Sequence, residues 1–212
     1  FYRREDTHAL KHHPAIIAKQ YEELFFGSVT DRQLPMGVSQ KKLLVALPSL
    51  VAGGTEHVLV TLLRHLSREQ FSITLVVVNC DNPFFLDQLP EDIEVIDLKK
   101  RRVRYAMFGL LRTVRRVRPN IIFSAMGHLN FAFVLLRPFM AKGTRIVGRA
   151  SDIATEIVNA SERPVLWHWA YRTLYPKLDR VICQSDYMRQ DLVDHFGLAV
   201  ANAVVINNPV DI

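Results

Sequence analysis

The 212-residue sequence has few cysteines and no long hydrophobic run. Its two cysteines, Cys80 and Cys183, end or lie within apolar stretches, and we expect both to be reduced core thiols of a cytosolic protein, with no disulfide between them. No apolar stretch reaches the roughly 18 residues that a membrane-spanning helix needs. Residues 1–17 lack a continuous apolar core and a cleavage site, which argues against a secretory signal there.

Acidic residues are missing from the middle of the chain. Between Asp97 and Asp152 there is no Asp or Glu, and this stretch holds 13 of the 27 Lys and Arg residues. The other residues carry 14 basic and 21 acidic side chains, a balance of −7, although the whole chain is +6. Such a concentration of positive charge suits phosphates, nucleic acid or an anionic membrane. The structural alternative is a solvated helix face with no specific partner.

Several catalytic and binding motifs are also absent. The chain has no G-x-G-x-x-G, no G-x-S-x-G, no H-E-x-x-H, no Walker loop and no C-x-x-C. These absences argue against a nicotinamide or flavin dehydrogenase, an esterase with a nucleophile elbow, a zinc peptidase, a P-loop nucleotidase and a thioredoxin-type enzyme. There is no D-x-D either, so a metal-held nucleotide has no obvious ligands and we expect no metal.

What the sequence does have, from Lys41 onward, is an alternation of strand-like and helix-like segments. The apolar runs 42–48, 71–79, 93–98, 120–125, 144–151, 179–185 and 203–212 have strand length, and helical patterns lie between most of them. Because the strands are apolar on both faces, they predict a mainly parallel, doubly wound α/β sheet of about seven strands with helices on both faces. Residues 41–212 would form this Rossmann-like domain, and residues 1–40 an N-terminal helical arm with a linker.

Two loops stand out, because ligands of such sheets bind beyond the carboxyl ends of the strands. Gly53 and Gly54 follow the first strand, where glycines let a backbone approach a phosphate and a helix start attracts anions. Alternatively, the glycine pair only lets the chain turn. His128 follows the fourth strand at a predicted helix start, where the helix dipole would lower its pKa and favour a neutral imidazole. Alternatively, it merely caps its helix.

Four segments resemble retaining glycosyltransferases of family 4, which use nucleotide sugars. They are "VAGGTEHVLVTLL", "FSAMGHLN", "RIVGRAS" and "DRVICQSDYMRQDLVDHFGL" continued by "VVINNPVD". The resemblance covers residues 41–212 and implies one half of a two-domain GT-B enzyme, the half that mostly holds the acceptor. The family's donor half carries two glutamates eight positions apart, and no glutamates here have that spacing. We therefore expect the donor domain to be absent from these residues.

The resemblance also implies roles for individual residues. His128 would be catalytic, hydrogen-bonding the transferred sugar and stabilising the oxocarbenium-like centre. Gly53, Gly54 and Thr55 would face the donor diphosphate. The residues expected near the acceptor are Asn130, Arg149 and Ser151. The nucleotide sugar would be a co-substrate, and no further cofactor is expected.

The implied function is transfer of a sugar from a nucleotide sugar to a glycan or a lipid-linked acceptor. We expect activity only when a donor domain, including one on a separate subunit, completes the chain, and none from the chain alone. The alternative is a non-catalytic Rossmann-like module that binds a phosphorylated ligand or a partner protein.

A basic amphipathic helix is predicted over residues 103–119. Its apolar stripe should be Val103, Met107, Leu110, Val114 and Val117, with Tyr105 and Phe108 among arginines opposite. Basic side chains interleaved with aromatics suit an interfacial helix on anionic lipid. The membrane-binding set would be Lys99, Lys100, Arg101, Arg102, Arg104, Arg112 and Arg116. Since no nucleic-acid motif accompanies this charge, we expect a cytoplasmic protein, peripheral on the inner face of the membrane, that binds no nucleic acid.

Overall fold

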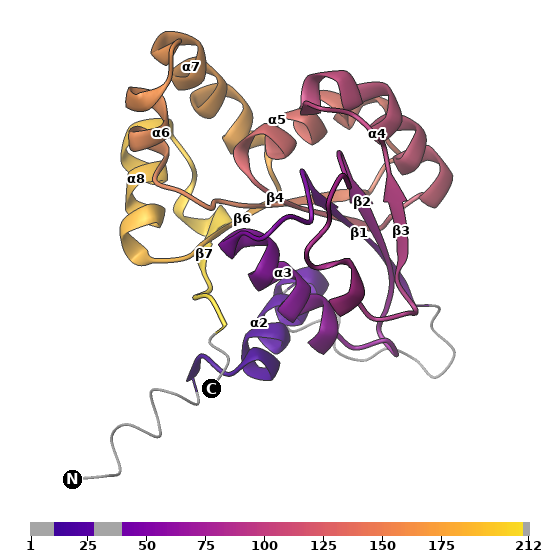
Figure 1. Ribbon diagram of the computed structural model, residues 1–212. Helices are drawn as coiled ribbons and strands as arrows, with labels where there is room; N and C mark the ends of the chain where they lie inside the picture. Colours follow the sequence, from indigo (N-terminus) through magenta and orange to yellow (C-terminus); the bar gives the residue numbers. More distant parts are fainter. Residues whose placement is uncertain (1–10, 28–39, 210–212) are drawn as a thin grey trace, which may run out of the picture.

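The centre of the computed structural model, which describes residues 11–27 and 40–209, is a seven-stranded sheet (Figure 1). Every neighbouring pair of strands is parallel, and the spatial order is β3-β2-β1-β4-β5-β6-β7. The strands are β1 (Lys41–Leu47), β2 (Phe71–Val77), β3 (Glu94–Asp97), β4 (Ile121–Ala125), β5 (Arg145–Arg149), β6 (Arg180–Cys183) and β7 (Ala203–Val205). The predicted doubly wound α/β fold with about seven strands is therefore confirmed.

Helices cover both faces of the sheet. They are α2 (Pro14–Phe26), α3 (Gly54–His65), α4 (Val103–Val117), α5 (Gly127–Leu136), α6 (Ala154–Ala160), α7 (Pro164–Leu174) and α8 (Asp186–Phe196). Short 3-10 turns are η2 (Leu86–Gln88), η3 (Arg137–Phe139), η4 (Tyr175–Lys177) and η5 (Val200–Asn202). The patterns of α3, α4, α5, α7 and α8 predicted helices at these places, whereas α6 was not predicted.

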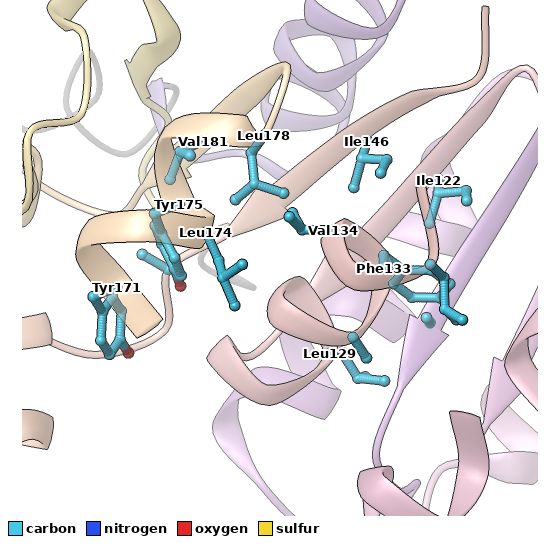
Figure 2. Close-up of a cluster of buried hydrophobic side chains, with 14 of the residues drawn as sticks. Ile122, Leu129, Phe133, Val134, Ile146, Tyr171, Leu174, Tyr175, Leu178 and Val181 are labelled. Atoms are coloured by element: carbon cyan, nitrogen blue, oxygen red, sulfur yellow. The ribbon is translucent and has the colours of Figure 1, made fainter. Parts of the chain in front are cut away.

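The two faces of the sheet carry separate apolar clusters, because successive residues of a strand point to opposite sides. In β1, Leu44 and Ala46 belong to one cluster, together with residues of α4, α5, α7 and α8. Leu43, Val45 and Leu47 belong to the other, with residues of α2 and α3. Figure 2 shows the first cluster where α5 packs beside the end of α7. Because β1 is buried on both faces, its sequence is a continuous apolar run, and this run predicted the strand.

Helix α2 belongs to the predicted N-terminal arm, yet it packs directly on the sheet. Tyr21 and Phe25 are almost fully buried, and each ring lies against Phe123 of β4, at centroid distances of 5.5 and 5.4 Å. Pro14 stands in the first turn of α2, where it costs no helical hydrogen bond. The described part of the arm therefore contributes to the core. Residues 1–10 and most of the predicted linker lie outside the described residues.

Both cysteines are free, as expected for reduced thiols. Cys183 is buried at the end of β6, and burial raises its pKa to about 12. Cys80 is only partly buried, so its expected place in the core is wrong. It lies in the loop between β2 and η2, outside the strand itself.

Candidate functional site at the switch point of the sheet

The predicted ligand loops flank the point where the strand order reverses. From β1, the strands β2 and β3 are added in sequence toward one edge of the sheet, whereas β4 to β7 are added toward the other edge. Since β1 and β4 are parallel neighbours, paired from Leu43 with Ile121 to Ala46 with Ser124, their carboxyl ends lie side by side. Helix α3 then packs on one face and α5 on the opposite face. A crevice between two diverging helices is where ligands bind in doubly wound sheets.

The glycine turn after β1 has one crowded side and one open side. Gly53 caps α3, and a Cβ on it would lie 2.4 Å from Oε2 of Glu56. Glu56 is buried, and its Oε1 accepts a hydrogen bond of 3.0 Å from the Ser49 hydroxyl. A Cβ on Gly54 would meet nothing within 4 Å. A side chain at position 53 would therefore have to displace the Glu56 carboxyl group, whereas the space beside Gly54 is open.

His128 lies in the first turn of α5, two residues after Met126, whose backbone is strained. Met126 has φ 115° and ψ 137°, a conformation that costs a bulky residue on the order of 1–3 kcal/mol. The His128 ring is exposed but packs edge-on against Trp167 of α7, at a centroid distance of 5.1 Å. Partial burial lowers the pKa of His128 below its usual 6.5. The imidazole is therefore mainly neutral at pH 7, able to donate one hydrogen bond and accept another.

A pocket of about 400 Å³ opens beside His128. It lies between the start of α5, the end of α6 and the start of α7, and is lined by His128, Ile157, Ala160, Ser161, Glu162, Arg163 and Trp167. The apolar side chains and the indole ring give it an apolar floor, while the charged and hydroxyl groups lie in the α6–α7 loop. A pocket of this size and mixed lining suits a small organic ligand or one part of a larger one.

Asn130 lies in the core, one helical turn from the exposed end of α5. Its Oδ1 accepts a 2.6 Å hydrogen bond from the Ser124 hydroxyl. Its Nδ2 donates to the Arg149 carbonyl at 3.2 Å and to the Tyr175 hydroxyl at 3.0 Å. Asn130 is fully buried and joins β4, β5 and η4. A direct contact with an acceptor, as predicted from the sequence, would require this network to open.

Arg149, at the end of β5, is also almost fully buried. Its Nη2 donates a 2.7 Å hydrogen bond to Oδ1 of Asn208, whereas Nε and Nη1 have no partner among the described residues. Tyr21 lies close by: burial raises the pKa of the Tyr21 phenol, and the charge of Arg149 opposes that rise. Ser151 is partly buried, and its hydroxyl likewise lacks a partner in the described structure. Both are predicted acceptor residues, but these donor atoms are shielded from solvent, and Arg149 interacts with Tyr21 of α2 in the core.

The predicted basic face of α4 is exposed. Arg104, Tyr105, Phe108 and Arg112 point to solvent, and the guanidinium of Arg104 lies 4.8 Å from the centre of the Tyr105 ring. Lys99, Lys100, Arg101 and Arg102 are exposed in the segment that leads into the helix. Arg116 is paired with Glu94 at 2.6 Å, which neutralises part of its charge. Of the predicted apolar stripe, Leu110 and Val114 are buried and Val103, Met107 and Val117 partly buried.

Sequence reasoning missed the residues that surround His128. Trp167 contacts its ring, and Ile157 and Arg163 line the same pocket. They come from α6 and α7, which follow the next strand along the chain. The one available signal was the pair of tryptophans in "LWHWAY", which are the only tryptophans of the chain. The structure therefore brings His128 together with α6 and α7, and leaves Asn130 buried and outside the lining of that pocket.

A Rossmann-like sheet with a glycine turn and a histidine beside its switch point places the chain in the class of doubly wound α/β domains, whose ligands bind at that point. Comparison with known families narrows that class. The model of Glycosyltransferase Family 4 matches residues 52–212, and the chain therefore belongs to this family. No curated protein sequence matches the chain.

Solved structures with the same fold include HepE of Anabaena in complex with UDP and glucose. Its TM-score is 0.62 at 14% identity, and the match covers 81% of this chain and 45% of HepE. The lipopolysaccharide outer core galactosyltransferase WaaB gives a TM-score of 0.58 at 14% identity, covering 82% and 47% of the two chains. A UDP-GlcNAc 2-epimerase from Neisseria meningitidis, bound to UDP-GlcNAc, gives 0.55 at 11% identity, covering 80% and 46%.

These matches establish the fold and its extent. The chain spans about half the length of each solved relative, so it has the fold of one half of a GT-B enzyme, consistent with the N-terminal half. At identities of 11–14%, the likeness alone assigns no activity, as the presence of an epimerase among these structures illustrates. Within the described residues, no helix is both long and apolar enough to cross a membrane.

Proposed function

We propose that this chain is the acceptor-side half of a retaining glycosyltransferase that transfers a sugar from a nucleotide sugar to a glycan or lipid-linked acceptor. The observation that carries the proposal is the family 4 match over residues 52–212, in a chain whose His128 stands beside a pocket at the switch point of the sheet. Membership of the family favours transfer over epimerisation, although both activities occur on this fold.

The donor would be a nucleotide sugar bound mainly by a second domain. HepE, whose fold this chain shares, was solved with UDP and glucose and with UDP-glucose. The donor diphosphate would approach the glycine turn at Gly54 and Thr55, where a Cβ on Gly54 would have no neighbour within 4 Å. The second domain would come from a longer chain or from a separate subunit.

The neutral imidazole of His128 would serve the transfer step. It donates a hydrogen bond to a hydroxyl of the transferred sugar and so positions the anomeric carbon, where positive charge develops as the bond to the diphosphate breaks. The acceptor oxygen forms the new bond on the same face of the sugar, and its proton passes to the departing phosphate. No carboxylate base is required on this chain. A lowered pKa fits this role, because a protonated ring would repel the developing positive charge.

The proposed activity is tested by joining the chain to a donor domain and following the product by NMR. With a panel of α-linked nucleotide sugars and membrane or glycan extracts as acceptors, we expect a new glycoside whose anomeric proton has the coupling constant of the donor's configuration. A product with the opposite configuration would contradict a retaining reaction. Hydrolysis or epimerisation of the donor with no new glycoside would contradict transfer itself.

Docking of α4 on an anionic membrane is the second part of the proposal. Phe108 is 79% exposed and Tyr105 59% exposed, and both lie among arginines on the outer side of the helix. Aromatic rings that enter the headgroup region beside cations that bind lipid phosphates are typical of interfacial helices. Val165 and Trp169 of α7 are also exposed, and α7 packs on the same face of the sheet as α4 (Figure 1).

Reversing two charges on α4 should release the protein from anionic vesicles. Each basic residue near such a surface contributes about 1 kcal/mol, so the double variant Arg104→Glu and Arg112→Glu should bind roughly 30-fold more weakly or worse. The measurement is sedimentation with vesicles of phosphatidylglycerol and phosphatidylcholine. A matched control reverses Lys19 and Arg64, exposed residues of α2 and α3 on the other face. Equal losses in both variants, or equal binding to neutral vesicles, would contradict docking through α4.

A further inference from the structure

A second pocket, of about 480 Å³, lies between α6, α7 and α8. Helix α6 separates this pocket from the His128 pocket. Residues three or four apart lie on the same side of a helix. Thr155 and Asn159 of α6 line this second pocket, whereas Ile157 and Ala160 line the one beside His128. The two pockets therefore open on two sides of the same short helix.

The polar floor of the second pocket is the carboxyl group of Asp191, which is 6% exposed. Thr155 holds it at both oxygens: the hydroxyl donates to Oδ1 at 2.6 Å, and the backbone N–H donates to Oδ2 at 3.1 Å. His195 Nδ1 lies 3.4 Å from Oδ1. Since the two oxygens of a carboxylate can accept about four hydrogen bonds, a fixed acceptor with spare capacity faces the pocket.

Aromatic rings and neutral polar groups form the walls. Tyr187 is 68% exposed at the start of α8, and His168 of α7 is exposed with its ring 5.3 Å from that of Phe196. The Asn159 amide and the ring of His195 complete the polar lining. A ligand ring with one apolar face can pack on these aromatic side chains, while polar groups at its edge form hydrogen bonds with the neighbouring polar side chains.

The lining also excludes other ligand classes. It contains no Lys or Arg, whereas phosphate and nucleotide sites depend on cations or free N–H groups. Among the described residues there is no group of His, Cys, Asp and Glu that could hold a metal ion. The Asp191 carboxyl group, the Asn159 amide and the imidazole rings suit the hydroxyl groups of a neutral ligand. The volume is at the lower end of the roughly 300–1,000 Å³ that small-molecule sites occupy.

We infer that this pocket binds one or two neutral sugar units of the acceptor glycan, away from the reacting end. The inference rests on the proposed function, because the acceptor in that proposal is a glycan. That glycan would extend from the His128 pocket across α6 into this second pocket. Tyr187 and His168 would pack against the C–H face of a pyranose ring. Asp191 and Asn159 would hydrogen-bond its hydroxyl groups.

The test is saturation-transfer NMR on the 212-residue chain. The probes are methyl glucoside, methyl galactoside, N-acetylglucosamine, maltose and lactose at millimolar concentration. We expect at least one of them to bind, and binding to weaken tenfold or more in Tyr187→Ala and in Asn159→Ala. The matched control is Phe139→Ala, an aromatic residue of η3 with a similar exposed fraction, which should bind as the parent does. Tyr187 and Asn159 line this pocket and not the one beside His128, so a loss in both variants locates the binding here.

Absence of binding by all five probes would overturn the inference. Binding that Tyr187→Ala and Asn159→Ala leave unchanged, or that Phe139→Ala weakens equally, would overturn it as well. The outcome is distinguishable from that of the proposed function. Sugar binding here by a protein whose completed form transfers nothing would leave this pocket standing and remove the transferase assignment. Transfer by a completed enzyme that binds no sugar in this pocket would support the transferase assignment and overturn the inference.

Discussion

Replacing His128 by alanine is expected to lower kcat by about 100-fold or more in an enzyme completed by a donor domain, with a smaller change in KM. The reason is that the imidazole would stabilise charge that develops only as the donor bond breaks. His128→Gln, which keeps a neutral hydrogen-bonding group, should recover part of the rate. Steady-state kinetics with the nucleotide sugar varied at saturating acceptor gives the measurement.

His65→Ala is the matched control for this prediction. His65 is an exposed histidine at the far end of α3, and its Nδ1 lies 2.8 Å from the Thr61 carbonyl oxygen, away from the switch point. It should leave both kinetic constants unchanged. An unaltered kcat in His128→Ala would contradict the catalytic role. Equal losses in the two variants would point to a general effect of removing a histidine rather than to the site.

Replacing Asn130 by alanine should lower the free energy of unfolding by about 3 kcal/mol. The change would leave the Ser124 hydroxyl, the Tyr175 hydroxyl and the Arg149 carbonyl without their buried partner, and each unsatisfied group costs about 1–3 kcal/mol. Tyr175→Phe removes only one of these hydrogen bonds and should cost about 1 kcal/mol. Urea unfolding followed by the fluorescence of Trp167 and Trp169, the two tryptophans of the chain, measures both variants.

The size of this effect separates two roles for Asn130. If it chiefly contacts an acceptor, as the family resemblance implies, the alanine variant should stay as stable as the parent and raise only the KM for acceptor. If it chiefly joins β4, β5 and η4, stability falls first. A loss below about 0.5 kcal/mol, or equal losses in Asn130→Ala and Tyr175→Phe, would contradict the network seen in the structure.

The sequence predicted those features that depend on local pattern. Strand β1 is buried on both faces and has a continuous apolar run, and the arginines of α4 recur at helical spacing opposite its apolar stripe. The glycine turn and His128 were found because each follows a predicted strand. Parallel strands place their carboxyl ends at one edge of the sheet, so the sequence alone predicted which loops form the candidate site.

The features that were missed depend on contacts distant in sequence. Helix α6 has only seven residues, several of them β-branched, and no side-chain cap of its own. Its first turn is capped by Asp191 of α8, at a separation of 36 residues. Asn130 is bonded to Tyr175 at a separation of 45. No local pattern reports such pairings, so the second pocket and the burial of Asn130 became visible only in the fold.

The most direct test of the central claim is a sugar-transfer assay run side by side on the isolated 212-residue chain and on the same chain joined to a donor domain. If the chain is the acceptor half, the isolated chain should transfer no sugar, because it contains no glutamate pair with the donor-site spacing. The joined protein should transfer the sugar with retained anomeric configuration. Turnover of a nucleotide sugar into glycoside by the isolated chain would contradict the acceptor-half account.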